Sequence, residues 1–297
     1  MPPVVKDTGA DKAFHVANTA FLIGILLLYA YPLWFVVIAS LSTPVEISQG
    51  NVWIVPRGTT IEAYRRVLTN DDILMGYRNT IFYTIAGVAV NVTMTVLAAY
   101  PLSRKRFFGR KIILIYLTFT MFFNGGLIPT YLVVNGLGLV NTFWVMIIPN
   151  AVSVFLIFIM RTFFVRTIPD ELYDASAIDG SSHVHTLVRV VLPVSGPVLA
   201  VMILFYGVGH WNSYFNALIY LSDRERFTLQ LILREILVQE RIDEMVDIAD
   251  EAYFEQAMLA EILKYAVIIF ASVPVLLLYP FLQRYFVKGV MIGAIKG

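Results

Sequence analysis

The chain has 297 residues, of which 58% are hydrophobic and only 14% are charged. Ordinary soluble domains carry about 25% charged residues, so this composition is typical of a protein embedded in a membrane. The formal net charge of +1 gives no indication of a nucleic-acid partner. Because the sequence has no cysteine, disulfides, thiol nucleophiles and thiolate metal ligands are excluded.

Six stretches are apolar and long enough to cross a bilayer as helices of about 20 residues. They are residues 20–41, 80–102, 112–134, 143–164, 190–211 and 264–283. The N-terminal segment 1–19 is too long and mixed for a signal peptide, so the first stretch is expected to be a retained span. We predict an all-α polytopic membrane protein with one six-helix transmembrane domain, residues 20–283.

The distribution of cations predicts the orientation, because short loops rich in Lys and Arg stay on the cytoplasmic side. The segment SRKRFFGRK, residues 103–111, holds five cations. The next loop, NGGLIPTYLVVNGLGLVNT at 124–142, holds none and has the Gly, Pro and Asn residues of a turn. Residues 103–111 are therefore expected in the cytoplasm, together with both termini, 1–19 and 284–297.

The loop between the fourth and fifth spans is polar and lies on the predicted cytoplasmic side. Thr167 and Asp170 have the spacing of a capping box, which predicts the start of a short helix. Gly180 can take the left-handed conformation that ends it. Ser181 or Ser182 can cap a second helix that leads to the fifth span.

On the first loop helix Glu171, Asp174 and Ala175 share a face, with Ser176 beside them. Small side chains allow another protein to approach closely, and carboxylates can pair with its cations. An amphipathic connector lying on the lipid headgroups is the alternative. Anionic headgroups would repel such an acidic helix.

The spacing in this loop resembles a known family. The loop reads Asp174-Ala175-Ser176, three residues, Gly180, nine residues, Val190, one residue and Leu192-Pro193. This resembles the EAA loop of the membrane subunits of binding-protein-dependent ABC importers, with Asp for Glu and Ser for the second Ala. The segments AAYPLSRKRFFGRK, GGLIPTYLVVNGLGLVNTFW, IMRTFF and RYFVKGVMIGAIKG are similar to the carbohydrate branch, which includes the maltose and the lipoprotein-linked sugar permeases.

The resemblance implies a type I ABC importer permease fold in which the loop 167–193 is the coupling helix that binds a cytoplasmic ATPase. Glu171, Asp174, Ala175 and Ser176 would form the contact surface and Gly180 the bend. Leu192 and Pro193 would join the loop to the fifth span. Residues 288–297 of the C-terminal tail are also expected to touch the ATPase.

The same resemblance implies the partners of the chain. They are a second, related permease in a heterodimer, two cytoplasmic ATPase subunits that bind ATP and Mg, and an extracytoplasmic solute-binding protein. The chain has no phosphate-binding G-x-x-x-x-G-K-[ST] loop of its own and needs no cofactor. The expected location is the bacterial cytoplasmic (inner) membrane.

An oligosaccharide path requires amides, hydroxyls and aromatic faces. The candidates are Asn124, Asn150, Trp211, Asn212, Tyr214 and Asn216. Each has an alternative structural role, because aromatic residues near span ends anchor helices at the interface. Amides within spans often bind neighbouring helices.

The outer loop 212–263 carries eleven acidic residues against four arginines between Asp223 and Glu261. It is either a solvated loop or a docking surface for an extracytoplasmic partner. The apolar spacing in FTLQLILREIL, residues 227–237, predicts that part of it packs on the membrane domain.

His183 and His185 form a pair without a third ligand at suitable spacing, so no metal site is predicted. A secondary transporter would normally place ionisable residues within the spans, and the spans contain almost none. An importer of a non-sugar solute remains an alternative, and for a sugar the resemblance first indicates alginate oligosaccharides or other polysaccharide fragments. Because the outer loop would repel a free polyanion, an acidic sugar is expected to arrive enclosed in its binding protein.

Overall fold

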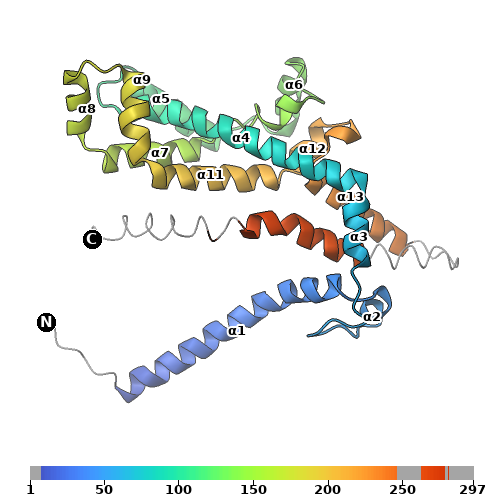
Figure 1. Cartoon of the computed structure of the whole chain (residues 1–297). Helices are drawn as coiled ribbons and strands as arrows, with labels where there is room; N and C mark the ends of the chain where they lie inside the picture. The colour runs from blue at the N-terminus through green and yellow to red at the C-terminus, as the bar shows by residue number, and fades with distance from the viewer. Residues whose placement is uncertain (1–7, 246–261, 278–279, 281–297) are drawn as a thin grey trace. The chain divides into compact units, whose positions relative to one another are not determined.

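The computed structural model describes residues 8–245, 262–277 and 280, which form helices, turns and loops without a β-strand (Figure 1). The helical fold class is therefore confirmed for these residues. The chain divides into two units, one made of residues 1–70 and 236–271 and the other of residues 71–235 and 272–297. The predicted tail 284–297 lies outside the described residues.

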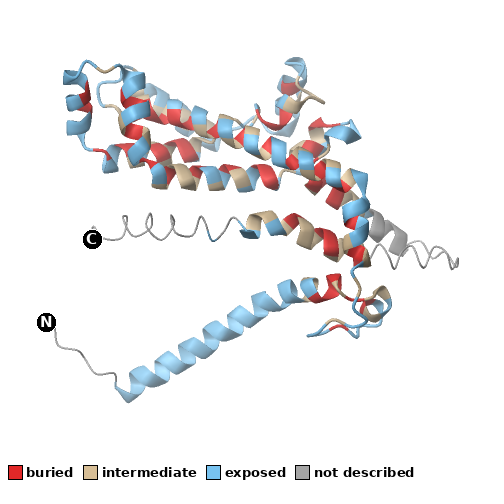
Figure 2. Ribbon diagram, viewed as in Figure 1, coloured by how far each residue is buried: buried red, intermediate tan, exposed pale blue. Residues whose placement is uncertain are grey.

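The first unit begins with α1 (Gly9–Ser40), which starts at a capping box. The Thr8 hydroxyl accepts a hydrogen bond from the Asp11 amide at 3.3 Å, and the Asp11 carboxylate accepts one from the Thr8 amide at 2.9 Å. Most of α1 is exposed along its length, and its buried residues are Ile38, Ala39 and Ser40 (Figure 2). After its first turns, which hold Asp11, Lys12 and Asn18, this exposed helix is apolar and is suited to lipid or to another membrane helix.

The end of α1 is tied to the segment that follows it. The Ser40 and Tyr64 hydroxyls lie 2.7 Å apart, and the Trp34 indole donates to the Ile54 carbonyl at 2.8 Å. This part of the unit contains α2 (Pro44–Ser48) and α3 (Glu62–Thr69). A further apolar helix covers Ile262–Leu277.

The second unit is built around one long helix, α4, which packs against α7 and α11. Its helices and helical turns are α4 (Asp71–Ser103), α5 (Arg110–Phe122), α6 (Leu127–Gly136), η1 (Phe143–Met146), α7 (Val154–Thr167), α8 (Asp170–Ile178), α9 (His183–His185), η2 (Thr186–Val191), α10 (Leu192–Val194), α11 (Gly196–Trp211), α12 (Phe215–Tyr220), η3 (Arg224–Arg226) and the start of α13 (Leu229–Met245). Buried residues of α4, α7 and α11 form a core cluster, and Figure 2 colours the buried positions of these helices red.

Gly87 on α4 permits the close approach of α11. A Cβ atom at this position would overlap the His210 imidazole. The buried His210 Nε2 lies 3.0 Å from the Asn91 amide oxygen, and the Asn91 nitrogen donates to the Asn150 carbonyl at 2.7 Å. Close contact at a small residue and hydrogen bonding between helices are common ways to join membrane helices.

Within the described residues, two helices are long and apolar enough to cross a membrane, α1 and α4. The number rises to four if each of two sharply bent helix pairs is taken as one span. The six predicted spans and the cytoplasmic termini therefore stay predictions. The stretch 80–102 lies within α4, and the stretch 20–41 lies within α1 except for Leu41, which is the C-cap of that helix.

Three predicted spans are not continuous helices. In 112–134 the chain bends by 116° between α5 and α6, where Gly126 has a φ of +81°. In 143–164 a short 3₁₀ turn and a loop precede α7. In 190–211 an 86° bend separates Val194 from Gly196. Gly, Pro and Asn residues at these points interrupt helices that hydropathy alone joins.

Candidate functional site: the polar loop between α7 and α11

The first loop helix, α8, begins at Asp170 after the extended residue Pro169. The predicted capping box is wrong, because Thr167 is the last residue of α7 and makes no cap of α8. Pro169 is the N-cap residue of α8, and because its side chain has no hydrogen-bond acceptor, it cannot cap the free amides of the first turn. Asp170 and Glu171 nevertheless lie in the first turn, where the helix dipole favours negative charge.

The turn after α8 agrees with the sequence. Asp179 is the C-cap, and Gly180 follows with a φ of +69°, a left-handed conformation that glycine adopts without steric cost. The Ser182 hydroxyl then accepts a hydrogen bond from the His185 amide at 3.2 Å. The predicted helix end, the glycine turn and the cap at Ser182 are therefore confirmed.

The second arm of the loop, His183–Val194, contains a wider π-helical turn before Pro193. Thr186–Val191 forms η2, and Pro193 lies in the short helix α10 that follows. A proline removes one backbone hydrogen bond and crowds the preceding turn, which a locally wider helix accommodates. Leu192 packs against the α4–α7–α11 core as a partly buried residue, whereas Pro193 is exposed, and the predicted role of the two residues in coupling stays a prediction.

The exposed face of α8 carries Glu171, Asp174 and Ala175, as the helical spacing predicts. Ser176 does not belong to that face. Its side chain is buried, and its hydroxyl lies 2.7 Å from the Thr186 hydroxyl on the second arm. The prediction that Ser176 is a surface contact is corrected, because this hydrogen bond turns it inward, where it joins the two arms.

The segment that follows α4 contacts α8 from outside the loop. The Arg104 guanidinium lies 3.2 Å above the Tyr173 ring, and the Asp170 carboxylate forms ion pairs with Arg104 at 3.6 Å and Lys105 at 3.2 Å. These ion pairs are solvent-exposed, so each contributes little on its own. The stacking of Arg104 on a buried aromatic ring contributes more.

A cavity of about 650 Å³ lies between α8 and the end of α4. Its lining is both basic and acidic, with Arg104, Lys105 and Arg106 from the segment after α4 and Asp170 and Asp174 from α8. Burial raises the pKa of the Tyr173 phenol, and the positive charge of Arg104 partly opposes this increase. The Tyr173 hydroxyl has no hydrogen-bond partner among the described residues.

Apolar packing against α7 and α11 also holds the loop in place. Tyr173, Leu187 and Val191 belong to the same buried cluster as Phe164 of α7 and Met202 of α11. A close-packed cluster of this kind transmits displacement. The acidic face of α8 is thus presented on a rigid support.

Four of the six predicted path residues, Trp211, Asn212, Tyr214 and Asn216, lie at the junction of α11 and α12, and the other two lie elsewhere in the sequence. Trp211 is buried and packs edge-to-face on Tyr77, with ring centroids 5.6 Å apart. The Asn212 amide donates to the Val208 carbonyl at the end of α11, and the Asn124 amide oxygen accepts from the Gly126 amide in the turn before α6. These three have structural roles in the chain.

The remaining path candidates are accessible to different degrees. The Asn150 carbonyl accepts the Asn91 hydrogen bond, and the Asn150 side chain is exposed. Tyr214 is exposed and Asn216 is half-buried, at the start of α12. Their roles in a path stay predictions.

Sequence reasoning missed the polar contacts within the core. The Thr95 and Tyr206 hydroxyls lie 2.6 Å apart, and the Tyr206 oxygen accepts from the Ser153 amide at 3.1 Å. Together with Asn91 and His210 they join α4, α11 and the segment before α7. No local pattern in the sequence indicates which polar residues of α4 and α11 form hydrogen bonds with one another.

The acidic segment 212–263, predicted to be an outer loop, is described only in part. The Arg224 guanidinium binds Asp72 at 2.9 Å and Glu235 at 3.2 Å, and these carboxylates raise its pKa. Leu229, Leu231 and Ile232 are buried, so the predicted packing of 227–237 is confirmed for these positions. No group of three or more His, Asp or Glu side chains that could hold a metal ion occurs in the described part of the chain.

Comparison with known proteins gives three consistent results. Residues 73–292 match the family of binding-protein-dependent transport system inner membrane components. Protein LplC of Bacillus subtilis is 37% identical over 293 residues, covering 99% of this chain and 98% of LplC. The polygalacturonan/rhamnogalacturonan transport system permease protein YtcP of the same organism is 35% identical over 97% of this chain and 99% of YtcP.

A solved structure is similar along nearly the whole chain. It is a chain from a bacterial ABC transporter involved in the import of the acidic polysaccharide alginate. The TM-score is 0.87 with 31% sequence identity, over 95% of this chain and 100% of that one.

Proposed function

Since the chain belongs to the family of binding-protein-dependent transport system inner membrane components, we propose that it is a permease subunit of an ATP-driven oligosaccharide importer. It forms half of a translocation path with a second, related permease. Two cytoplasmic ATPases bind ATP and Mg, and a solute-binding protein delivers the sugar from outside. The chain itself catalyses no reaction.

The observation that carries this proposal is the fixed, exposed acidic face of α8. Glu171, Asp174 and Ala175 are accessible, whereas Tyr173 and Ser176 of the same helix are buried beneath them. A surface of this kind can bind a partner and transmit its movement to α7 and α11, as the coupling helix of an importer must. Gly180 sets the angle between α8 and the second arm.

The proposed topology has six spans with both termini in the cytoplasm, in a bacterial inner membrane. The cations of residues 103–111 favour this orientation. The same segment contacts α8 through Arg104 and Lys105. The loop and the basic segment would therefore be on the same side of the membrane as the ATPases.

The proposed substrate is a fragment of an acidic polysaccharide, with alginate fragments as the first choice. YtcP is named for polygalacturonan and rhamnogalacturonan, and the similar structure is from an alginate importer. Alginate and polygalacturonan are both polymers of uronic acids. Uptake and binding-protein-stimulated ATP hydrolysis with alginate, polygalacturonan and neutral oligosaccharides would test this choice, and transport of a non-sugar solute alone would refute it.

The coupling role is tested by Gly180→Leu. A side chain at a left-handed position costs about 1–2 kcal/mol, which would shift the turn and tilt α8. We expect the complex to assemble in the membrane while substrate-stimulated ATP hydrolysis and transport are lost. Gly50→Leu is the matched control, because Gly50 also has a positive φ and open space around it. Unchanged transport in the Gly180 variant would contradict the coupling role.

A further inference from the structure

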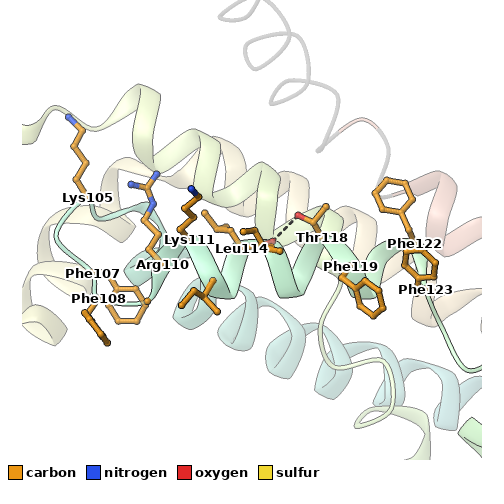
Figure 3. Close-up of a pocket in the computed structure, with 13 residues that line it drawn as sticks. Lys105, Phe107, Phe108, Arg110, Lys111, Leu114, Thr118, Phe119, Phe122 and Phe123 are labelled. Atoms are coloured by element: carbon orange, nitrogen blue, oxygen red, sulfur yellow. Dashed lines mark hydrogen bonds between the residues drawn. The ribbon is translucent and has the colours of Figure 1, made fainter.

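A groove of about 1030 Å³ runs along the outer side of α5 (Figure 3). Lys105, Arg110 and Lys111 lie at one end, and Phe122 and Phe123 lie at the other. None of the thirteen lining residues is acidic. The groove thus has a cationic end and an apolar body.

The apolar body of the groove is open to its surroundings. Phe108 is 96% exposed and Ile112 is 74% exposed, and no residue of α5 is buried. The one hydroxyl in the lining, that of Thr118, donates to the Leu114 carbonyl at 2.8 Å, as Figure 3 shows. Apart from its cationic end, the groove therefore offers almost only hydrocarbon and aromatic surface.

The cationic end has positive charge that is only partly neutralised by the residues that the structure describes. Lys105 binds Asp170, but Arg110 and Lys111 take part in no ion pair within the described residues. The Nε atom of Arg110 is buried and has no hydrogen-bond partner there. Because this Nε atom is covered, an anion at this end would instead pair with the exposed Lys111 and with the accessible part of the half-buried Arg110 side chain.

The length of the groove matches one leaflet of a bilayer. The thirteen residues of α5 span about 20 Å at 1.5 Å per residue. One leaflet of a bilayer, including its headgroup region, is about 20–22 Å thick. The cations therefore lie at headgroup depth when Phe119, Phe122 and Phe123 lie at acyl-chain depth.

We propose that this groove binds an anionic phospholipid of the cytoplasmic leaflet. The phosphate accepts hydrogen bonds from Arg110 and Lys111, and an acyl chain lies on the phenylalanines along α5. The orientation follows from the cytoplasmic placement of residues 103–111 proposed above. An apolar helix of a partner permease would cover the same phenylalanines but would leave Arg110 and Lys111 without a counter-charge.

The test uses the complete transport complex in vesicles with equal amounts of phosphatidylglycerol and phosphatidylcholine, followed by mass spectrometry of the retained lipid. We expect enrichment of phosphatidylglycerol. Each cation near an anionic headgroup contributes about 1 kcal/mol, which corresponds to about 5-fold in affinity. Arg110→Gln with Lys111→Gln should therefore lower the enrichment about 25-fold.

Arg57→Gln with Arg65→Gln is the matched control. It removes two exposed cations that form no ion pair among the described residues, and it should leave the enrichment unchanged. Phosphatidylglycerol with a photoreactive acyl chain should label residues 107–123 of the wild-type complex. Labelling confined to other segments, or equal retention of the two lipids by the wild-type complex, would overturn the proposal.

Transport measured in the same vesicles separates this inference from the proposed function. If the wild-type complex retains the two lipids equally but still takes up sugar, only the lipid site is refuted. Intact selectivity without ATP-driven uptake of any sugar refutes the proposed function and leaves the lipid site standing.

Discussion

The contact between Gly87 of α4 and His210 of α11 allows a sharp test of the core. Gly87→Ala would place a Cβ atom within the imidazole of His210, whose Nε2 is also bonded to Asn91. Overpacking costs about 1–3 kcal/mol, and loss of the hydrogen bond adds about 1 kcal/mol. We expect the variant to lose about 2–4 kcal/mol in total.

The matched control is Gly207→Ala on α11. A Cβ atom there would lie 3.8 Å from the Val88 side chain, an ordinary van der Waals contact. Alanine favours a helix over glycine by about 1 kcal/mol, so this variant should be neutral or more stable. Adding His210→Ala to Gly87→Ala should restore part of the loss, because it makes room for the methyl group.

The assay is the thermal midpoint of the detergent-solubilised complex, followed by size-exclusion chromatography after heating. Gly87→Ala should have a lower midpoint than both the wild type and Gly207→Ala. Equal midpoints for the two alanine variants would refute the close approach of α4 and α11 at this position. If His210→Ala does not restore stability to the Gly87→Ala variant, the methyl group must clash with a residue other than His210.

Two further predictions concern the loop. Thr186→Val should destabilise the complex by about 1–3 kcal/mol, because it leaves the buried Ser176 hydroxyl without its partner. Ser176→Ala should cost less, because Thr186 still donates to the Ser182 carbonyl, and equal midpoints for the two variants would contradict this asymmetry. The raised pKa of Tyr173 means that the folded state favours the neutral phenol. The resulting stability is present below about pH 10, the ordinary pKa of tyrosine, and is lost as the pH rises through the higher folded-state value. The thermal midpoint of Tyr173→Phe should therefore fall less steeply than that of the wild type above pH 10, and parallel curves would contradict burial of the hydroxyl.

The parts of the loop that the sequence predicts correctly are those determined by neighbouring residues. Gly180 and Ser182 act on the backbone within a few positions of themselves, so the end of α8 and the cap of the next helix are readable locally. The predicted cap at Thr167 is wrong because the preceding helix extends to that residue. Ile168 and Pro169 are the only residues between α7 and α8, and Thr167 remains in the earlier helix.

The contacts that give the loop its support could not be predicted from local patterns. Arg104 and Tyr173 are far apart in the sequence, and their stacking depends on how α4 packs beside α7. The inward direction of Ser176 likewise depends on Thr186 being opposite it. The break between α5 and α6 was partly visible in the Asn-Gly-Gly turn, but hydropathy alone extended the span across it.

The packing of the loop explains why a force on α8 would reach the membrane helices. Tyr173 lies in the same cluster as Phe164, and Leu187 and Val191 continue that cluster toward Met202. The Ser176–Thr186 hydrogen bond prevents the two arms from separating, and Arg104 holds the Tyr173 ring from the other side. Because a close-packed core is not compressible, a partner that pulls on Asp174 must move α7 and α11 together or release these contacts. Coupling would then depend on the rigidity of the loop, and variants that loosen it should uncouple transport even when the acidic face is intact.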